Sequence, residues 1–175
     1  MKKISIKEAE LLIKAVRKAI KAIMEKDEEF EIKSIPKSLL EKKGVFVTVY
    51  VNNELRGCIG TIEPVHENLA IEIRENGIAA ATRDYRFSPV TVDELDEIQV
   101  SVDVLGEPEP VESIDELDPE IYGVIVVSGW KKGVLLPAIE GVDSIEEQLR
   151  IAKLKAGIYS SEPYEIYRFT VERYF

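Results

Sequence analysis

The fold is decided by residues 45–60, which read VFVTVYVNNELRGCIG. Residues 45–51 are all β-branched or aromatic, a composition that predicts a strand. Asn52 and Asn53 suit a two-residue hairpin loop, because asparagine tolerates a positive φ better than most residues do. Such a loop sets the register of the returning strand. The predicted pairs are Val51 with Glu54, Tyr50 with Leu55, Val49 with Arg56 and Val47 with Cys58.

The returning strand holds the only cysteine of the chain, Cys58, between Gly57 and Gly60. Side chains alternate across a strand, so Arg56, Cys58 and Gly60 are expected on one face, with the thiol beside a guanidinium. The two glycines would leave the neighbouring backbone uncovered, which suits close approach by a ligand or by another backbone. We therefore take Arg56, Gly57, Cys58 and Gly60 as candidate site residues.

Two interpretations of Cys58 stay open at this point. A free cysteine is among the most buried residue types, and valines on the facing strand would make its surroundings apolar. Alternatively the thiol is a nucleophile or a ligand contact, with Arg56 or Arg86 supplying the positive charge that thiolate formation needs. The only histidine, His66, would have to fold back onto this strand to act as a base, so a Cys-His pair is not favoured.

Length and composition limit the class of protein. A chain of 175 residues with 45% apolar and 32% charged residues fits one globular domain, 1–175. No apolar run approaches the roughly 20 residues that cross a bilayer, and one cysteine cannot form an internal disulfide, so we expect a cytoplasmic protein without membrane contact. The net charge of −10 disfavours a nucleic-acid surface.

The patterns along the chain mix helices with adjacent strands and predict an α+β fold with a mostly antiparallel sheet flanked by helices. Helical periodicity, opened by a capping box at Ser5, runs to about residue 26, and a second capping box opens a helix at Ser144 that stops at Gly157. The expected elements are helices at 5–26, 68–82 and 144–156, a short helical piece at 92–95, further strands at 98–105, 122–127, 134–136 and 164–171, and a connector at 106–119.

Four pieces of the sequence together resemble one family. Leu55-Arg56-Gly57-Cys58-Ile59-Gly60 is similar to the signature hexapeptide of the AMMECR-type domain family, whose bacterial members include the AmmeMemoRadiSam system protein A group. Later landmarks match in order and extend the resemblance over nearly the whole chain. They are Asp84-Tyr85-Arg86-Phe87-Ser88-Pro89, Leu135-Leu136-Pro137 and Lys155-Ala156-Gly157.

The resemblance carries expectations about architecture and site. It implies two unequal lobes with a cleft between them, the larger lobe built from the N- and C-terminal parts and the smaller one placed at residues 65–105. It adds Asp84 and Arg86 to the site. The planar guanidinium of Arg86 suits a carboxylate or phosphate ligand, and an internal ion pair with one of the acidic side chains of the chain is an equally open role. Many family members carry a second cysteine before Lys-Ala-Gly. Residues 150–154 of this chain lack it, which argues against a mechanism with two thiols.

The expected function has two forms. The first is a cleft-binding or accessory component that works with a Memo-like protein and a radical-SAM protein, as the resemblance implies. The second is an enzyme that uses Cys58 as the nucleophile on a small anionic substrate; whether the chain is an enzyme stays open. One cysteine and one histidine cannot build a zinc site, and no phosphate-binding glycine motif occurs, so we expect neither a metal nor a cofactor.

Overall fold

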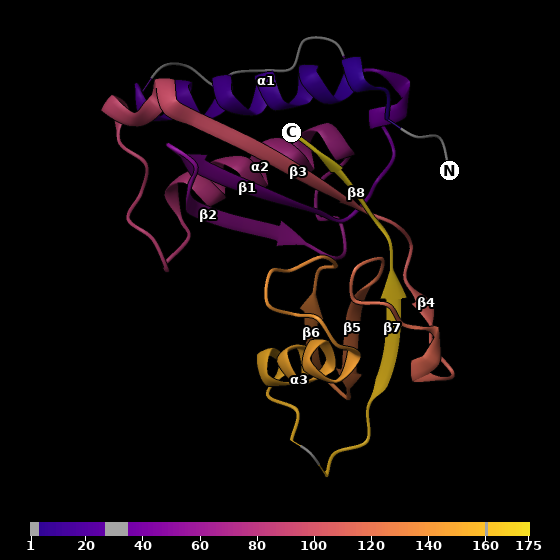
Figure 1. Cartoon of the computed structure of the whole chain (residues 1–175). Helices are drawn as coiled ribbons and strands as arrows, with labels where there is room; N and C mark the ends of the chain where they lie inside the picture. The colour runs from indigo at the N-terminus through magenta and orange to yellow at the C-terminus, as the bar shows by residue number, and fades with distance from the viewer. Residues whose placement is uncertain (1–3, 27–34, 160) are drawn as a thin grey trace. The chain divides into compact units, whose positions relative to one another are not determined.

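A computed structural model describes residues 4–26, 35–159 and 161–175 of the chain (Figure 1). The chain divides into two compact units, residues 1–104 with 173–175 and residues 105–172. Residues 65–104 of the expected smaller lobe therefore fall inside the first unit. The arrangement of a larger and a smaller lobe that the resemblance implies stays a prediction.

The first unit is built on a four-stranded sheet in the order β2-β1-β3-β8, in which β2 and β3 are antiparallel to β1. Residues 45, 47, 49 and 51 of β1 are buried, while the residues between them are partly exposed, so that one face of the strand packs into the core. The elements of this unit are α1 (Ile6–Met24), η1 (Lys37–Leu39), β1 (Val45–Val51), β2 (Glu54–Thr61), α2 (Leu69–Thr82), η2 (Val92–Glu97), β3 (Ile98–Leu105) and β8 (Val171–Tyr174); the unit boundaries fall inside the last two strands, after residue 104 and before residue 173.

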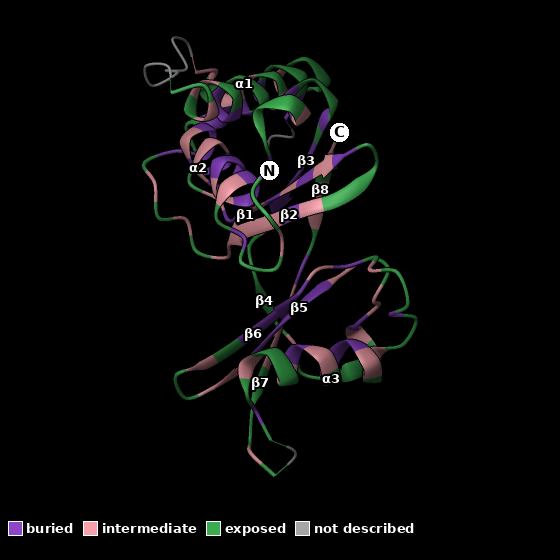
Figure 2. Ribbon diagram, turned by 90° about the vertical axis from the view of Figure 1, so that its left-hand side faces the viewer, coloured by how far each residue is buried: buried purple, intermediate pink, exposed green. Residues whose placement is uncertain are grey.

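The two long helices of the first unit pack against each other, and α2 also packs against β1 and β2. The predicted capping box is confirmed: the Ser5 side chain accepts from the backbone N–H of Glu8, and the Glu8 carboxylate accepts from the N–H of Ser5. The side chain of Asn68 caps α2 in the same way, accepting from the N–H of Ile71. Figure 2 shows that α2 carries many buried positions, which place it at the centre of this core.

The predicted hairpin is present, but the predicted register is wrong beyond its first two pairs. Asn52 and Asn53 both have positive φ, 52° and 65°, as the loop requires. Val51 pairs with Glu54 and Tyr50 pairs with Leu55, as predicted, but a β-bulge then inserts one extra residue. Arg56 is that residue, and beyond it Val49 pairs with Gly57, Thr48 with Cys58 and Val47 with Ile59.

The second unit is a four-stranded sheet in the order β4-β7-β5-β6, with α3 packed against β5 and β6. The single strand predicted at 164–171 is two strands in the structure. The first ends at Phe169, and a strand of the other sheet begins at Val171. The elements are β4 (Glu109–Pro110), η3 (Ile114–Glu116), β5 (Gly123–Ser128), β6 (Lys131–Leu135), α3 (Ile145–Ala156) and β7 (Glu165–Phe169).

The helix α3 begins and ends where the sequence predicts. Ser144 accepts from the N–H of Glu147, and Gly157 takes a left-handed conformation with φ of 66° that ends the helix. The two antiparallel sheets and their helices confirm the α+β class. None of the described helices combines the length and the apolar character that crossing a membrane requires.

Candidate functional site

Cys58 lies on β2, the strand at one edge of the first sheet. Its backbone N–H donates to Asp84 Oδ2 at 2.9 Å, and its carbonyl oxygen accepts from Arg86 Nη2 at 2.9 Å. An edge strand exposes such groups for pairing with another chain. Here Asp84 and Arg86 bind the backbone of Cys58 much as a neighbouring strand would.

Asp84 and Arg86 form a tight two-pronged ion pair. Arg86 Nε lies 2.9 Å from Asp84 Oδ1 and Nη2 lies 2.7 Å from Oδ2, while the backbone N–H of Arg86 donates to Oδ1 at 3.2 Å. The side chain of Asp84 is 1% exposed and that of Arg86 is 49% exposed. Arg86, and after it the N–H of Cys58, holds the pKa of Asp84 well below its usual range, although burial opposes this. Asp84 in turn raises the pKa of Arg86.

The Cys58 sulfur accepts a hydrogen bond from Thr48 Oγ1 at 3.3 Å, since the bulge brings Thr48 rather than Val47 opposite it. Burial raises the pKa of the thiol. Thr48 and the charge of Arg86 act in the opposite direction without overcoming it, and the carboxylates of Asp103 and Asp84 reinforce the rise. The group is therefore a protonated thiol near neutral pH, whereas the nucleophilic form is the thiolate.

Arg56 is directed to a different partner from the one expected. It forms an ion pair with Glu94 through Nη1, its Nη2 lies 3.2 Å from Glu94 Oε2, and Nη2 also donates to the carbonyl oxygens of Ser88 and Pro89 at 3.3 Å. The cation that acts on the thiol is Arg86, not Arg56. Arg56, followed by the N–H of Thr91, lowers the pKa of Glu94 to about 2.

Glu94 was not among the sequence-predicted site residues, although a signal for it exists. Thr91 and Glu94 form a capping box at the start of η2, a pattern readable from Thr-x-x-Glu. What the pattern does not reveal is that the same carboxylate also binds Arg56, 38 residues away in sequence.

The two glycines of the hexapeptide are required by packing inside the first unit. Gly57 is buried, and a Cβ there would collide with the carbonyl oxygen of Ala80 on α2. A Cβ on Gly60 would collide with the ring of Phe46. Glycine at both positions allows close approach, as predicted. The group that approaches Gly57 is a helix backbone, and the group that approaches Gly60 is an aromatic ring.

A second buried carboxylate, Glu72 of α2, fixes the loop that follows β2. Its side chain is fully buried, and it accepts from the Thr61 hydroxyl, from the backbone N–H groups of Val65 (2.9 Å) and His66 (2.7 Å), and from Asn76 Nδ2 (3.4 Å). His66, the sequence candidate for a base, enters this network through its backbone. The sequence does not mark Glu72 as a buried acceptor, because a single glutamate in an apolar helix is an ordinary pattern.

Three large apolar side chains are exposed on β2, on the loop that holds Asp84 and Arg86, and on η2. Tyr85 is 94% exposed although Asp84 and Arg86, its two neighbours, are fixed on β2; Val92 and Leu55 are 52% and 43% exposed. We call these three residues the motif surface. No group of three or more His, Cys, Asp or Glu side chains within residues 4–26, 35–159 and 161–175 is arranged to hold a metal ion.

The chain matches known proteins over most of its length. A protein of Thermotoga maritima is 62% identical over 144 residues, which cover 81% of this chain and 83% of that protein. A protein of Clostridium acetobutylicum is 55% identical over 133 residues, which are 76% of this chain but 28% of that protein, so the chain spans under a third of that relative.

A solved structure and a family model agree with these relatives. The crystal structure of an uncharacterized protein from Pyrococcus horikoshii matches with a TM-score of 0.88 at 34% identity, covering 97% of this chain and 92% of that one. The AMMECR1 family model matches residues 13–174. The chain therefore belongs to the AMMECR1 family.

Proposed function

We propose that this chain is an accessory component that binds a partner protein through the motif surface. The observation that carries the proposal is Tyr85, which is 94% exposed between two residues that are anchored to β2. Tyrosine is enriched among the residues that dominate protein–protein binding, because it buries a large rigid area at low entropic cost. The candidate partners are the Memo-like and radical-SAM proteins that the resemblance implies.

The polar groups of the hexapeptide region support a docking role because they already bind one another. Arg56 is held by Glu94, and Arg86 is held by Asp84 and by the carbonyl oxygen of Cys58. Such contacts preorganise the loop that presents Tyr85, and a preorganised surface loses less entropy on binding than a mobile one.

The alternative, an enzyme with Cys58 as nucleophile, is disfavoured by the raised pKa of the thiol. We expect native Cys58 to react with a small thiol reagent at pH 7 more slowly than the same residue in the denatured chain. Reaction faster than in the denatured chain, together with protection by a small anion, would favour the enzymatic reading.

The Clostridium acetobutylicum relative is consistent with an accessory role. The matched region makes up 28% of that protein, so the region occurs there within a much longer chain. A domain that acts on or beside another domain can be joined to it covalently, since the link raises the effective concentration of the two.

Co-purification with Memo-like and radical-SAM proteins of the same genome tests the proposal. We expect a complex at micromolar concentration, weakened about tenfold or more by Tyr85→Ser, which removes the exposed ring. Tyr159→Ser is the matched control, because Tyr159 is an exposed tyrosine of the second unit. Equal binding by the Tyr85→Ser variant, or no complex with either protein, would contradict the proposal.

A further inference from the structure

Two hollows of about 450 and 390 Å³ lie on the first unit and share the residues Ile13, Arg17 and Phe175. Because they share three lining residues, we treat them as the two halves of one groove beside α1, here called the α1 groove. Each hollow lies within the range of roughly 300–1,000 Å³ that small-molecule sites occupy. None of the three residues of the motif surface lines either hollow.

One half of the groove is lined by four cations of α1 and by two carboxylates, those of Glu10 and Asp96. The four cations are Lys14, Arg17, Lys18 and Lys21, at steps that place them on one face of a helix. Lys21 also forms an ion pair with Glu25 at 3.8 Å. The four cations nevertheless outnumber the two carboxylates of the lining, so this half of the groove favours an anion.

Arg17 is the central residue of the groove, since it lines both halves. Six of the eight arginines of the chain form ion pairs with carboxylates. Arg17, by contrast, makes no ion pair or hydrogen bond with residues 4–26, 35–159 or 161–175. The paired arginines are Arg56, Arg74, Arg86, Arg150, Arg168 and Arg173.

The other half of the groove has a different character. It is lined by neutral hydrogen-bonding side chains, Tyr50, Asn53, Gln99 and Ser101, beside the apolar Val100 and Phe175. Neutral polar groups with an apolar wall suit a flat organic body, whereas a guanidinium with flanking lysines suits a dianionic phosphate.

From this division we infer that the α1 groove binds a small phosphate monoester. Its phosphate group lies on Arg17 and the neighbouring lysines, and its organic body lies against Tyr50 and Phe175. The two halves meet at Arg17, so a single molecule bridges them.

Phenyl phosphate is the probe for the full chain, with inorganic phosphate, benzoate and benzyl alcohol as its comparison ligands. We expect phenyl phosphate to bind in the millimolar range or tighter, to raise the melting temperature, and to shift the amide resonances of Arg17, Tyr50 and Ser101. Inorganic phosphate and benzoate should bind more weakly, and benzyl alcohol weakest of all. Equal binding of phenyl and inorganic phosphate would overturn the assigned role of the organic half.

Arg17→Gln should weaken phenyl phosphate binding about tenfold or more, because hydrogen bonds to a charged group are lost. Arg83→Gln is the matched control: Arg83 is exposed, lies outside the groove, and its loss changes the net charge equally. An equal loss of phenyl phosphate affinity in both variants would mean that binding depends only on general charge attraction, and would overturn the proposed site. Shifts centred on Arg56 and Arg86, or no binding at millimolar concentrations, would also overturn it.

Discussion

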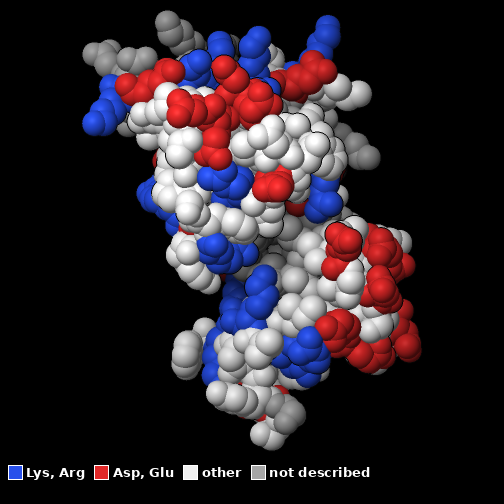
Figure 3. Space-filling model, turned by 60° about the vertical axis from the view of Figure 1, so that its left-hand side comes forward, with Lys and Arg blue, Asp and Glu red and all other residues white. Residues whose placement is uncertain are grey.

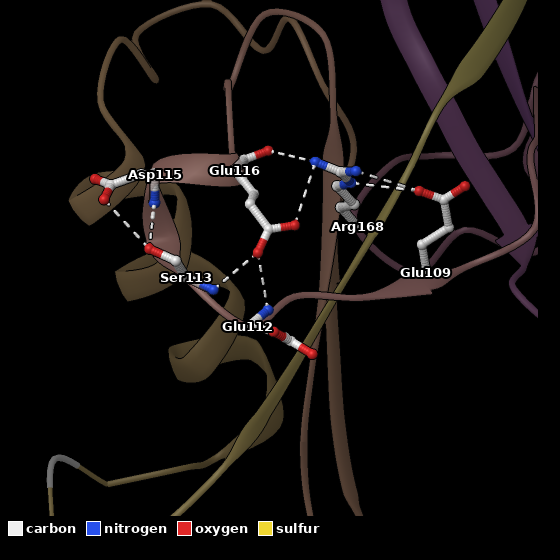
Figure 4. Close-up of polar contacts among 6 residues, drawn as sticks. All are labelled: Glu109, Glu112, Ser113, Asp115, Glu116 and Arg168. Carbon is white, nitrogen blue, oxygen red and sulfur yellow. Dashed lines mark hydrogen bonds and ion pairs between the residues drawn. The ribbon is translucent and has the colours of Figure 1, made fainter.

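The two units contain the same kind of contact, an arginine held by carboxylates, in opposite surroundings. In the first unit Asp84 is 1% exposed and binds both Arg86 and the backbone of Cys58. In the second, Arg168 lies 3.4 Å from Glu109 Oε2, and its Nη1 donates to the carbonyl oxygen of Glu116 at 2.8 Å (Figure 4). Glu109 is 66% exposed. Solvent and salt screen an exposed pair, so only the first arrangement should contribute much to stability.

The units also differ in charge. Residues 105–172 carry 14 acidic and six basic side chains, whereas the rest of the chain carries 19 acidic and 17 basic ones. Figure 3 shows acidic and basic side chains gathered on different parts of the second unit's visible face. Where acids exceed bases so strongly, most carboxylates stay solvated, and the few buried carboxylates of the first unit carry the structural role instead.

Glu72→Ala should have the largest effect on stability. The carboxylate is fully buried and accepts hydrogen bonds from a hydroxyl, an amide side chain and two backbone N–H groups. Its loss removes the shared acceptor of these partly buried donors and leaves a cavity inside α2's packing, and we expect the free energy of unfolding of the first unit to fall by about 3 kcal/mol. Urea denaturation followed by amide resonances of each unit measures this. A loss below about 0.5 kcal/mol would show that water replaces the carboxylate without cost.

Asp84→Ala should come next, at about 2 kcal/mol, because it removes the acceptor of the Cys58 N–H and the partner of Arg86. Arg86 is half exposed and can be solvated, which keeps the effect below that of Glu72→Ala. Arg83→Ala, at the adjacent exposed residue, is the control and should change the stability little. Equal losses in the two variants would mean that the loop, rather than the ion pair, sets the stability.

Acidification should weaken the first unit more than the second, because Asp84 is buried, whereas the carboxyl groups of the second unit with a lowered pKa, those of Glu116, Glu147 and Glu162, are partly exposed. The pKa of Asp84 is depressed in the folded state and that of Glu94 falls to about 2, while unfolded carboxyl groups titrate near 4. Groups with a depressed pKa stabilise the fold above pH ~4 and lose that contribution as the pH falls through the folded-state pKa.

The measurement for this prediction is urea denaturation of each unit between about pH 5 and pH 2. Asp84→Asn should flatten the pH dependence of the first unit and leave that of the second unchanged. Parallel curves for wild type and variant would show that other carboxylates govern acid unfolding. Acidification of the wild-type chain should lower the stability of the first unit less than Asp84→Ala does, since a protonated Asp84 retains part of its hydrogen bonding.

Local signals in the sequence predicted the elements better than their pairing. Helix caps depend on neighbouring residues, so Ser5, Ser144 and Gly157 marked their helices correctly. The hairpin loop at Asn52 and Asn53 was equally readable. The bulge at Arg56 was not, because no pattern in the neighbouring residues marks it, and the close approach of Gly57 to Ala80 involves a helix that comes later in the chain.

The candidate site divides in the same way. The resemblance placed Cys58, Asp84 and Arg86 together, and the structure has them in direct contact. Long-range partners were missed: Glu94 was not connected with Arg56, and Glu72 was not singled out at all. A carboxylate in a helix or a cap looks the same in sequence whether water or a distant guanidinium surrounds it, and only burial in the folded chain separates the two cases.

The smallest effect is expected for Glu109→Gln, within about 0.5 kcal/mol of the wild-type stability. Both contacts of this carboxylate with Arg168 are 3.4 Å long and made by one exposed oxygen. Arg168 also keeps its bond to the carbonyl oxygen of Glu116 and its position 4.7 Å from the Tyr122 ring centroid. Denaturation of the second unit at low and high salt measures the change. A loss as large as that of Asp84→Ala would show that burial does not separate the two pairs, because the exposed one would then contribute as much as the buried one.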